Sequence, residues 1–411
     1  MRDVLQFLKT SISIVLRGDA RYYRWVGFLT FWIVLGIAAW IYQFIFGLQV
    51  TSLTDQVPWG AYIANFSFTV GLASAALILV ILSWLNHGEH LGELIVVGQI
   101  TSIAALTMGM LFVVVDLGRP DRFWHLIPVI GMFNFPISML SWDVVVLNGY
   151  LALNFYLATY WVFSRFRGSK VSRAKYRPIL MVAIGWAVSI HVIAAFLYAG
   201  LGSRPHWNAA ILAPRVLASA FGSGPAMLII ILTVIRDRMG VPIRDNAIGH
   251  LRQVLTVAAL ANLFFFGAEI FTELYAGTAH ATPLRYLLFG LRGHHLLVPF
   301  IWAATALNVG ACVVLCAKTL YSRNAFLIAA CAATIVGMWV EKGMGLVIPG
   351  FIPSSLGEIV EYAPSFVEFC VCAGVWAIGG LVLTVLLRVA VPVEFLGLRM
   401  DGARTESEAT P

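Results

Sequence analysis

Long apolar runs alternate with short polar segments along nearly the whole chain of 411 residues. Most runs match the roughly 20 residues that a helix needs to cross the hydrocarbon core of a bilayer. The pattern predicts an all-α, polytopic membrane protein with about ten transmembrane helices. Their expected boundaries lie near 25–49, 60–85, 93–116, 137–163, 179–200, 208–235, 251–276, 296–318, 325–341 and 364–390.

Composition agrees with this pattern, since 60% of the residues are apolar and only 11% are charged. The mean hydropathy of +0.87 excludes a soluble globular domain. Residues 1–24 form a basic, partly amphipathic lead-in, and no short apolar core with a small-residue cleavage site follows the N-terminus. We therefore expect no removable signal peptide. The polar tail, residues 394–411, is expected to be disordered.

The distribution of Lys and Arg predicts the orientation of the spans. Of the 27 basic residues, 20 lie on the side that carries the two termini, and 7 lie on the opposite side. Cytoplasmic loops carry the excess of positive charge in membrane proteins. Both termini are therefore expected in the cytoplasm, in a multi-pass protein of the cytoplasmic (inner) membrane. The net charge of +7 consequently gives no indication of nucleic-acid binding.

A weak internal repeat divides the chain. Small residues recur at 70–76 and 221–227, where they let helices approach closely, and Asp116 corresponds in position to Glu273. This internal repeat predicts two parallel four-helix bundles, made of spans 2–5 and spans 6–9. Spans 1 and 10 would then be flanking helices. The expected divisions are 1–24 (lead-in), 25–59 (first span and outer loop), 60–207 (first bundle), 208–341 (second bundle), 342–393 (outer loop and last span) and 394–411 (tail).

Several polar side chains of the first bundle fall at similar depth below the outer surface. They are Asn65, Asp116, Asp143 and His191, one from each of spans 2–5. Singly, each has a structural explanation: Asp116 could pair with Arg119 to hold a helix end, and His191 could be a satisfied interior histidine. Together they favour a polar pocket. A carboxylate, an amide and an imidazole provide the hydrogen bonds and proton acceptors that a quinone headgroup needs.

The second bundle carries Glu269 and Glu273, which are four residues apart and so share a helix face. Such intramembrane carboxylates indicate either a proton relay or a helix-packing pair. The repeat and the buried carboxylates would also suit a secondary transporter or another ion-conducting membrane protein with a site between the bundles. A transporter is expected to have broken helices in both repeats, whereas Pro225 is the one clear interior breaker in the sequence.

Metal and haem sites are not expected. The five cysteines lie in apolar runs without nearby ligands, which is typical of small core residues and indicates neither an iron–sulfur cluster nor a disulfide framework. Bis-histidine haem ligation requires two histidines that face each other within the spans. Of the nine histidines, only His191 is well inside a predicted span.

Short motifs across most of the chain resemble those of the NrfD-like family, the membrane subunits of polysulfide-reductase-type complexes. Within this family the resemblance is to the branch with ten spans, which includes DsrP and HybB. The motifs are Val57-Pro58-Trp59-Gly60, the turn Asp116–Pro120, Ser141-Trp142, Lys342-Gly343-Met344-Gly345, Pro349-Gly350 and Leu356-Gly357-Glu358-Ile359. The resemblance implies a cofactor-free subunit that binds menaquinone or ubiquinone in the first bundle. It also implies electron exchange with an extracytoplasmic, ferredoxin-like iron–sulfur subunit, and further membrane and cytochrome partners of a Dsr-type or hydrogenase-type complex.

These arguments together predict a quinone-interacting subunit of a respiratory redox complex. Whether this subunit also translocates protons is left open by the sequence. Asp143 or His191 would accept the quinol protons, and Asn65 would help to line the site. Trp142 would pack against the headgroup, and Arg119 would hold Asp116 ionised at the rim. Glu269 and Glu273 would form the proton pathway. The outer loop 343–363 is long enough to dock a partner.

Overall fold

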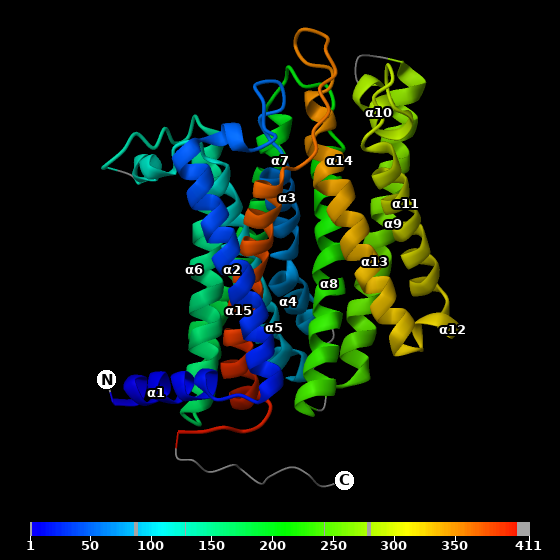
Figure 1. The fold of residues 1–411 in the computed structure, drawn as a ribbon. Helices are drawn as coiled ribbons and strands as arrows, with labels where there is room; N and C mark the ends of the chain where they lie inside the picture. The colour runs from blue at the N-terminus through cyan, green and yellow to red at the C-terminus, as the bar shows by residue number, and fades with distance from the viewer. Residues whose placement is uncertain (1, 86–88, 128, 242, 278–280, 401–411) are drawn as a thin grey trace.

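The computed structural model describes residues 2–85, 89–127, 129–241, 243–277 and 281–400, with the backbone alone at 84–85, 89–93 and 173. Within these ranges the chain is helical, apart from turns, loops and one isolated bridge between Leu291 and His294. The long helices run side by side between two faces (Figure 1). They are α2 (Ala20–Phe46), α3 (Ala61–Leu72) with α4 (Ala75–Leu85), α5 (Glu89–Asp116), α6 (Met139–Phe166), α7 (Arg173–Ala199), α8 (Leu212–Met239), α9 (Asp245–Ala276), α11 (Val298–Cys316), α13 (Asn324–Lys342) and α15 (Phe366–Glu394).

Nine helical stretches of the described residues are long and apolar enough to cross a membrane, which confirms the polytopic helical fold. The remaining predicted span, 137–163, is the fourth along the chain and forms α6, which is 28 residues long and packs against both α5 and α7.

Both described ends of the chain lie at one face of the bundle, which we call the terminal face. The amphipathic helix α1 (Arg2–Leu16) lies across this face (Figure 1). The Gln6 amide donates to the Met400 carbonyl at 2.9 Å, and the Met400 amide donates to the Phe166 carbonyl at the end of α6. The predicted tail is therefore ordered as far as Met400, and residues 401–411 lie outside the described residues.

The opposite end, which we call the distal face, carries the longer connections and the short helices η1 (Leu48–Val50), η2 (Pro120–Leu126), α10 (Ala281–Phe289), α14 (Met344–Val347) and η3 (Pro349–Phe351). The terminal face has only one short helix besides α1, namely α12 (Lys318–Tyr321), among the described residues. Half of the predicted docking loop 343–363 is buried. The Trp207 indole donates to the Leu346 carbonyl at 2.8 Å and lies against Gly350. The exposed part of this loop therefore begins near Pro353.

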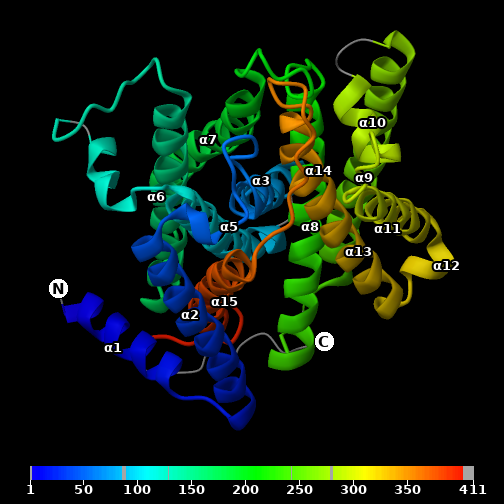
Figure 2. The same cartoon turned by 45° about the horizontal axis from the view of Figure 1, so that its top comes forward.

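The helices pack as two groups. In the first, α5 contacts α3, α4, α6 and α15, and α6 contacts α7; in the second, α8, α9, α11 and α13 contact one another. Figure 2 shows α2 and α15 on one side of the molecule and α11 on the other. The groups meet where α8 contacts α3, α4 and α7. The last span is more than a flanking helix, because α15 packs against α2, α3, α5 and α6.

The predicted span 60–85 is broken at Ala73-Ser74, where α3 ends and α4 begins. The Ser102 hydroxyl of α5 spans this break: it donates to the Ala73 carbonyl at 2.7 Å and accepts from the Ala76 amide at 3.1 Å. Ser74 in turn donates to the Ala220 carbonyl of α8 at 2.9 Å. Gly224 permits this contact, since a Cβ there would lie 2.6 Å from the Ser74 hydroxyl.

The predicted breaker Pro225 does not interrupt α8, which runs unbroken from Leu212 to Met239. A proline removes one helical hydrogen bond, but neighbouring helices in a membrane bundle can re-satisfy the freed group. The break in the first bundle is instead accompanied by a polar side chain of α5, since the Ser102 hydroxyl bonds to the backbone on both sides of it. Only one of the two corresponding spans is broken, so the pair of broken helices expected of a transporter is not formed in the described residues.

Candidate functional site

The distal end of the first bundle is organised around Glu368, a fully buried carboxylate in the first turn of α15. It accepts hydrogen bonds from the Ser52 amide at 2.9 Å and from the Tyr362 hydroxyl. That hydroxyl also accepts from the amide of Ala61, the first residue of α3, at 2.8 Å. A side chain at Gly60 would collide with the Tyr362 ring. The motif that opens the second span therefore receives its cap from the loop before α15.

Asn65 joins the two bundles. Its side-chain oxygen accepts from the indoles of Trp339 on α13 at 3.0 Å and Trp376 on α15 at 2.9 Å. Its amide nitrogen donates to the Ala61 carbonyl at 2.8 Å and contacts the Cys372 sulfur at 3.6 Å. These bonds use its acceptor and both donors, so Asn65 fixes the helices around the predicted pocket.

Asp143 and Asp116 carry unmet hydrogen-bonding capacity. Asp143 is 2% exposed, and its Oδ1 has no hydrogen-bond partner among the described residues; the same holds for Oδ1 of Asp116, at the end of α5. Both carboxylates lie near enough to the Tyr198 phenol to interact with it electrostatically, and the Tyr198 hydroxyl is hydrogen-bonded to Ser67 of α3. Asp116 of α5, Asp143 of α6 and Tyr198 of α7 thus place their side-chain oxygen atoms in one region of the first bundle. Buried polar atoms normally have partners, so these carboxylates can receive a proton or a donor from a ligand.

His191 lies deeper along α7 than this carboxylate pair. Seven residues separate it from Tyr198, which is about 10 Å along a helix. Its Nδ1 is 2.6 Å from the Ala187 carbonyl, and the Gly71 carbonyl near the end of α3 is its neighbour on the other side. His191 therefore lies beside the α3–α4 break, where it can link a polar group near the distal face to the bundle interior.

Two predicted site residues lie at the surface. The Trp142 indole donates to the Pro136 carbonyl at 2.8 Å and packs on Phe135 in the loop before α6. Arg119 does not pair with Asp116; it forms a two-pronged ion pair with Asp121, with both bonds at 3.0 Å. Pro120 begins η2 and turns the backbone, which brings Asp121 within reach. The hydrogen bond from Arg119 lowers the pKa of Asp121, so both side chains are charged at neutral pH.

The second bundle holds a buried ionic network that sequence analysis missed. Arg215, four residues into α8, donates to Glu269 of α9 and to Glu341 of α13, the latter at 3.2 Å. The amides of Asn262 and Asn308 also donate to Glu341, at 2.9 and 3.0 Å. Arg215 is one of the seven basic residues on the predicted outer side, yet it is only 2% exposed. Glu269 is therefore the ion-pair partner of a second span.

Lys342 and Glu341 are adjacent in sequence, and adjacent side chains of a helix point in different directions. Instead the Lys342 Nζ lies 3.3 Å from Glu341 Oε1, and both side chains are buried. Here α13 ends, at Lys342, and the chain turns at Gly343 into α14, which lets the long lysine side chain fold back. The signal in the sequence was the recurrence of ionisable residues near the distal ends of three spans of one bundle.

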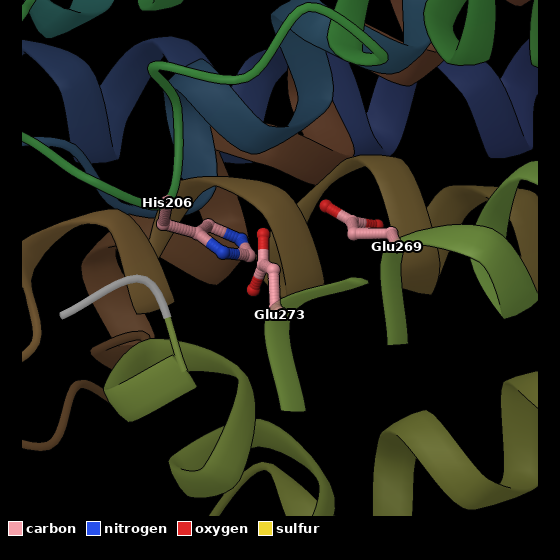
Figure 3. A group of neighbouring side chains, drawn as sticks. All are labelled: His206, Glu269 and Glu273. Carbon is pink, nitrogen blue, oxygen red and sulfur yellow. The ribbon is translucent and has the colours of Figure 1, made fainter. Parts of the chain in front are cut away.

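Glu273 lies one turn beyond Glu269 and faces His206, which lies in the connection between α7 and α8 (Figure 3). Ligand atoms of these three residues all lie within 4.8 Å of one another, and all three are buried. Neither oxygen of Glu273 accepts a hydrogen bond from the described residues. Sequence analysis missed His206 because it precedes the sixth apolar run and is distant from Glu273 along the chain.

A smaller polar cluster stabilises the distal loops. Glu361 accepts from the Leu296 amide at 2.7 Å, lies 3.3 Å from the His294 ring, and accepts from the Tyr286 hydroxyl at 3.3 Å. Partial burial opposes ionisation of Glu361, but these hydrogen bonds outweigh it and lower its pKa. Of the remaining histidines, His87 and His280 lie outside the described residues.

Comparison with known proteins extends across both bundles. The chain is 25% identical over 404 residues to a putative dimethyl sulfoxide reductase membrane subunit of Halobacterium salinarum, covering 89% of this chain and 90% of that protein. It is 23% identical over 433 residues to a selenate reductase subunit of Mesobacillus selenatarsenatis, with coverage of 93% and 96%. A third relative, the Hdr-like menaquinol oxidoreductase integral membrane subunit of Archaeoglobus fulgidus, is 23% identical over about half of each chain.

The family model for polysulphide reductase, NrfD, matches residues 49–352. This range includes the broken span, the carboxylates of the first bundle and the ionic network of the second. It leaves out α2 and α15, although α15 supplies Glu368 and Trp376 to the distal cluster. The chain therefore belongs to the NrfD family of polysulphide-reductase-type membrane proteins.

Proposed function

We propose that the chain is the quinone-interacting membrane subunit of a respiratory redox complex. It exchanges electrons between membrane quinol or quinone and an iron–sulfur subunit at the distal face. The observation that carries this proposal is the unmet hydrogen-bonding capacity of Asp116 and Asp143 around Tyr198. The quinone is menaquinone or ubiquinone, and the name of the Archaeoglobus relative, a menaquinol oxidoreductase subunit, favours the former.

Quinol oxidation releases two electrons and two protons, so the site must provide proton acceptors. Asp143 takes this role near the distal face, and His191 takes it deeper along α7. Asp116 accepts a hydrogen bond from the headgroup, and Asn65 positions α3 through its bonds to two indoles. Trp142 and Arg119 belong to the rim rather than to the headgroup site.

An apolar groove of about 190 Å³ lies beside Val115, the residue before Asp116. It is formed by α2, α5 and α15, and its lining includes Trp40, Leu111 and Val371. An isoprenoid tail requires such an apolar passage from the lipid to the polar end of the site. We assign this groove to the quinone tail.

The distal face carries the partner surface. Between α5 and α6, the loop exposes apolar side chains to an unusual degree, with Val129, Met132 and Ile137 at least 80% exposed. Large exposed apolar groups of this kind indicate a protein or membrane contact. We propose a ferredoxin-like iron–sulfur subunit as the partner, within a Dsr-type or hydrogenase-type complex that contains further membrane and cytochrome subunits. Purification in mild detergent with identification of the co-purifying subunits tests this assignment.

Proton translocation would use the second bundle. Glu269 and Glu273 form its distal entry, and the network through Arg215 and Glu341 extends it across three spans. Orientation follows from the basic residues: both termini are cytoplasmic, in the inner membrane. An alkaline phosphatase fused at the C-terminus should be inactive, and one inserted in the loop 120–135 should be active. The reverse pattern would overturn the orientation and with it the side on which the partner docks.

A photoactivatable azidoquinone tests the quinone site directly. Labelling of the purified complex should modify peptides from α5, α6 or α7 near Asp116, Asp143 and Tyr198, and excess quinone should suppress it. Labelling restricted to α8, α9 or α13 would contradict the site. Labelling nowhere in this chain, but in another subunit, would contradict the proposed function.

A further inference from the structure

The ionic network of the second bundle has more negative than positive groups. Among its described members, Arg215 and Lys342 are cationic, whereas Glu269, Glu273 and Glu341 are carboxylates. Arg215 and Lys342 contact Glu269 and Glu341, and Glu273 receives no hydrogen bond from either. A buried carboxylate without a partner is costly, so Glu273 needs a cation or a proton.

We propose that His206, Glu269 and Glu273 form a binding site for one first-row divalent transition-metal ion such as Zn²⁺. One imidazole and two carboxylates form a mixed nitrogen and oxygen set, which suits such ions better than Mg²⁺ or Ca²⁺, since these prefer oxygen alone. Glu273 itself points to a bound cation, since the residue is only 7% exposed and its carboxylate, which faces His206 (Figure 3), has no hydrogen-bond partner among the described residues.

The geometry requires little adjustment. Ligand atoms around a tetrahedral ion at 2.0–2.2 Å lie about 3.4 Å apart. The three ligand atoms are already within 4.8 Å of one another, so rotations of the two glutamate side chains would close the site. Among the described residues, the Glu269 carboxylate accepts its hydrogen bond from Arg215 through Oε2. Its other oxygen, Oε1, can bind the ion. Arg215 then orients this ligand, as outer-shell groups do in metal sites.

The site is independent of the quinone proposal, because it shares no residue with the proposed quinone site. Metal binding to the purified full-length chain, without turnover, therefore tests it separately. We expect one Zn²⁺ per chain after equilibrium dialysis, with a raised thermal unfolding midpoint and with Mg²⁺ and Ca²⁺ unable to compete. His206→Gln and Glu273→Gln should each weaken Zn²⁺ binding about 100-fold. The matched control His295→Gln, at an exposed histidine on the same face, should bind as the unsubstituted chain does.

If those variants fold poorly, replacing one metal-binding side chain by another still tests the proposal. In His206→Cys a thiolate replaces the imidazole, so Zn²⁺ binding should persist and Co²⁺ should gain a thiolate charge-transfer absorption that the unsubstituted chain lacks. Failure of the chain to bind Zn²⁺ would overturn the proposal and leave a proton, on Glu273 or on His206, as the compensating charge. Undiminished binding in folded His206→Gln and Glu273→Gln, or a folded His206→Cys variant without the new Co²⁺ absorption, would also overturn it.

Discussion

The two bundles solve the problem of buried polarity in opposite ways. In the first, Asp116 and Asp143 are carboxylates without cationic partners among the described residues, and both lie near the Tyr198 phenol. In the second, Arg215 and Lys342 meet three carboxylates in one network. Unsatisfied polar groups without a charged partner suit a ligand that exchanges hydrogen bonds and protons, whereas paired charges suit a permanent structural or ionic role. Buried carboxylates in the two bundles thus have different surroundings and suit different chemical roles.

The strongest test of this contrast removes the central cation of the second bundle. Arg215→Met leaves Glu269 and Glu341 without their shared partner and should lower the free energy of unfolding by about 3–5 kcal/mol. Unfolding in detergent micelles, followed by helical circular dichroism, measures this loss. Arg292→Met serves as the control, because Arg292 is exposed. Adding Glu269→Gln and Glu341→Gln to Arg215→Met should recover part of the stability; no recovery would show that charge pairing is not the cause.

The next test asks which bundle handles quinol. Asp143→Asn keeps the shape of the side chain and removes its titration, so quinol turnover should fall about 10²-fold, equivalent to about 2.7 kcal/mol in the barrier. Assembly of the complex, measured by co-purification, should be retained. Glu273→Gln is the matched comparison in the second bundle, because it removes a carboxylate of the proposed proton pathway and none of the quinone site. If Glu273→Gln abolished turnover while Asp143→Asn and His191→Gln left it unchanged, the quinone would have been assigned to the wrong bundle.

The break between α3 and α4 gives a third, smaller test. Ser102→Ala leaves the Ala73 carbonyl and the Ala76 amide without their partner and should cost about 1–3 kcal/mol of unfolding free energy. Thr107→Ala is the control on the same helix, because the Thr107 hydroxyl bonds only within its own helix, to the Ile103 carbonyl at 2.8 Å. Equal stability of the two variants would mean that the break does not depend on Ser102.

The smallest expected effect concerns the distal loops. Because its hydrogen bonds lower the pKa of Glu361 below the ordinary value of 4.5, ionised Glu361 stabilises the folded state above that pH. This contribution is lost as the pH falls through the lowered pKa. Glu361→Gln should therefore reduce the thermal midpoint slightly at neutral pH and have no effect in stronger acid. A pH series of melting curves measures the difference, and a deficit that grows in acid would contradict the assignment.

Periodicity and composition were sufficient for the architecture, because hydrophobic length is what a bilayer selects. They placed all ten long helices, including α6, and they singled out Asp143, Asp116 and His191 by depth alone. They could not reveal which charged side chains form ion pairs, because Arg215, Glu269 and Glu341 come from helices far apart in sequence. Nor could they locate the break at Ala73-Ser74, which depends on a serine of another span rather than on a local proline. Glu368 was overlooked because it lies at the start of a span treated as an addition.

The hydrogen bonds of Ser102 also constrain how the protein is made. A broken helix in lipid exposes backbone groups that cost several kcal/mol each when they lack partners. The segment 61–85 leaves the ribosome before Ser102 does, and before Ala220 of α8, so nothing can yet satisfy a break at that stage. We therefore expect this segment to enter the membrane as one straight helix and to bend only after α5 docks. The bend would then mark a late step of biogenesis, and trapping of nascent chains that end before residue 102 would capture the unbent form.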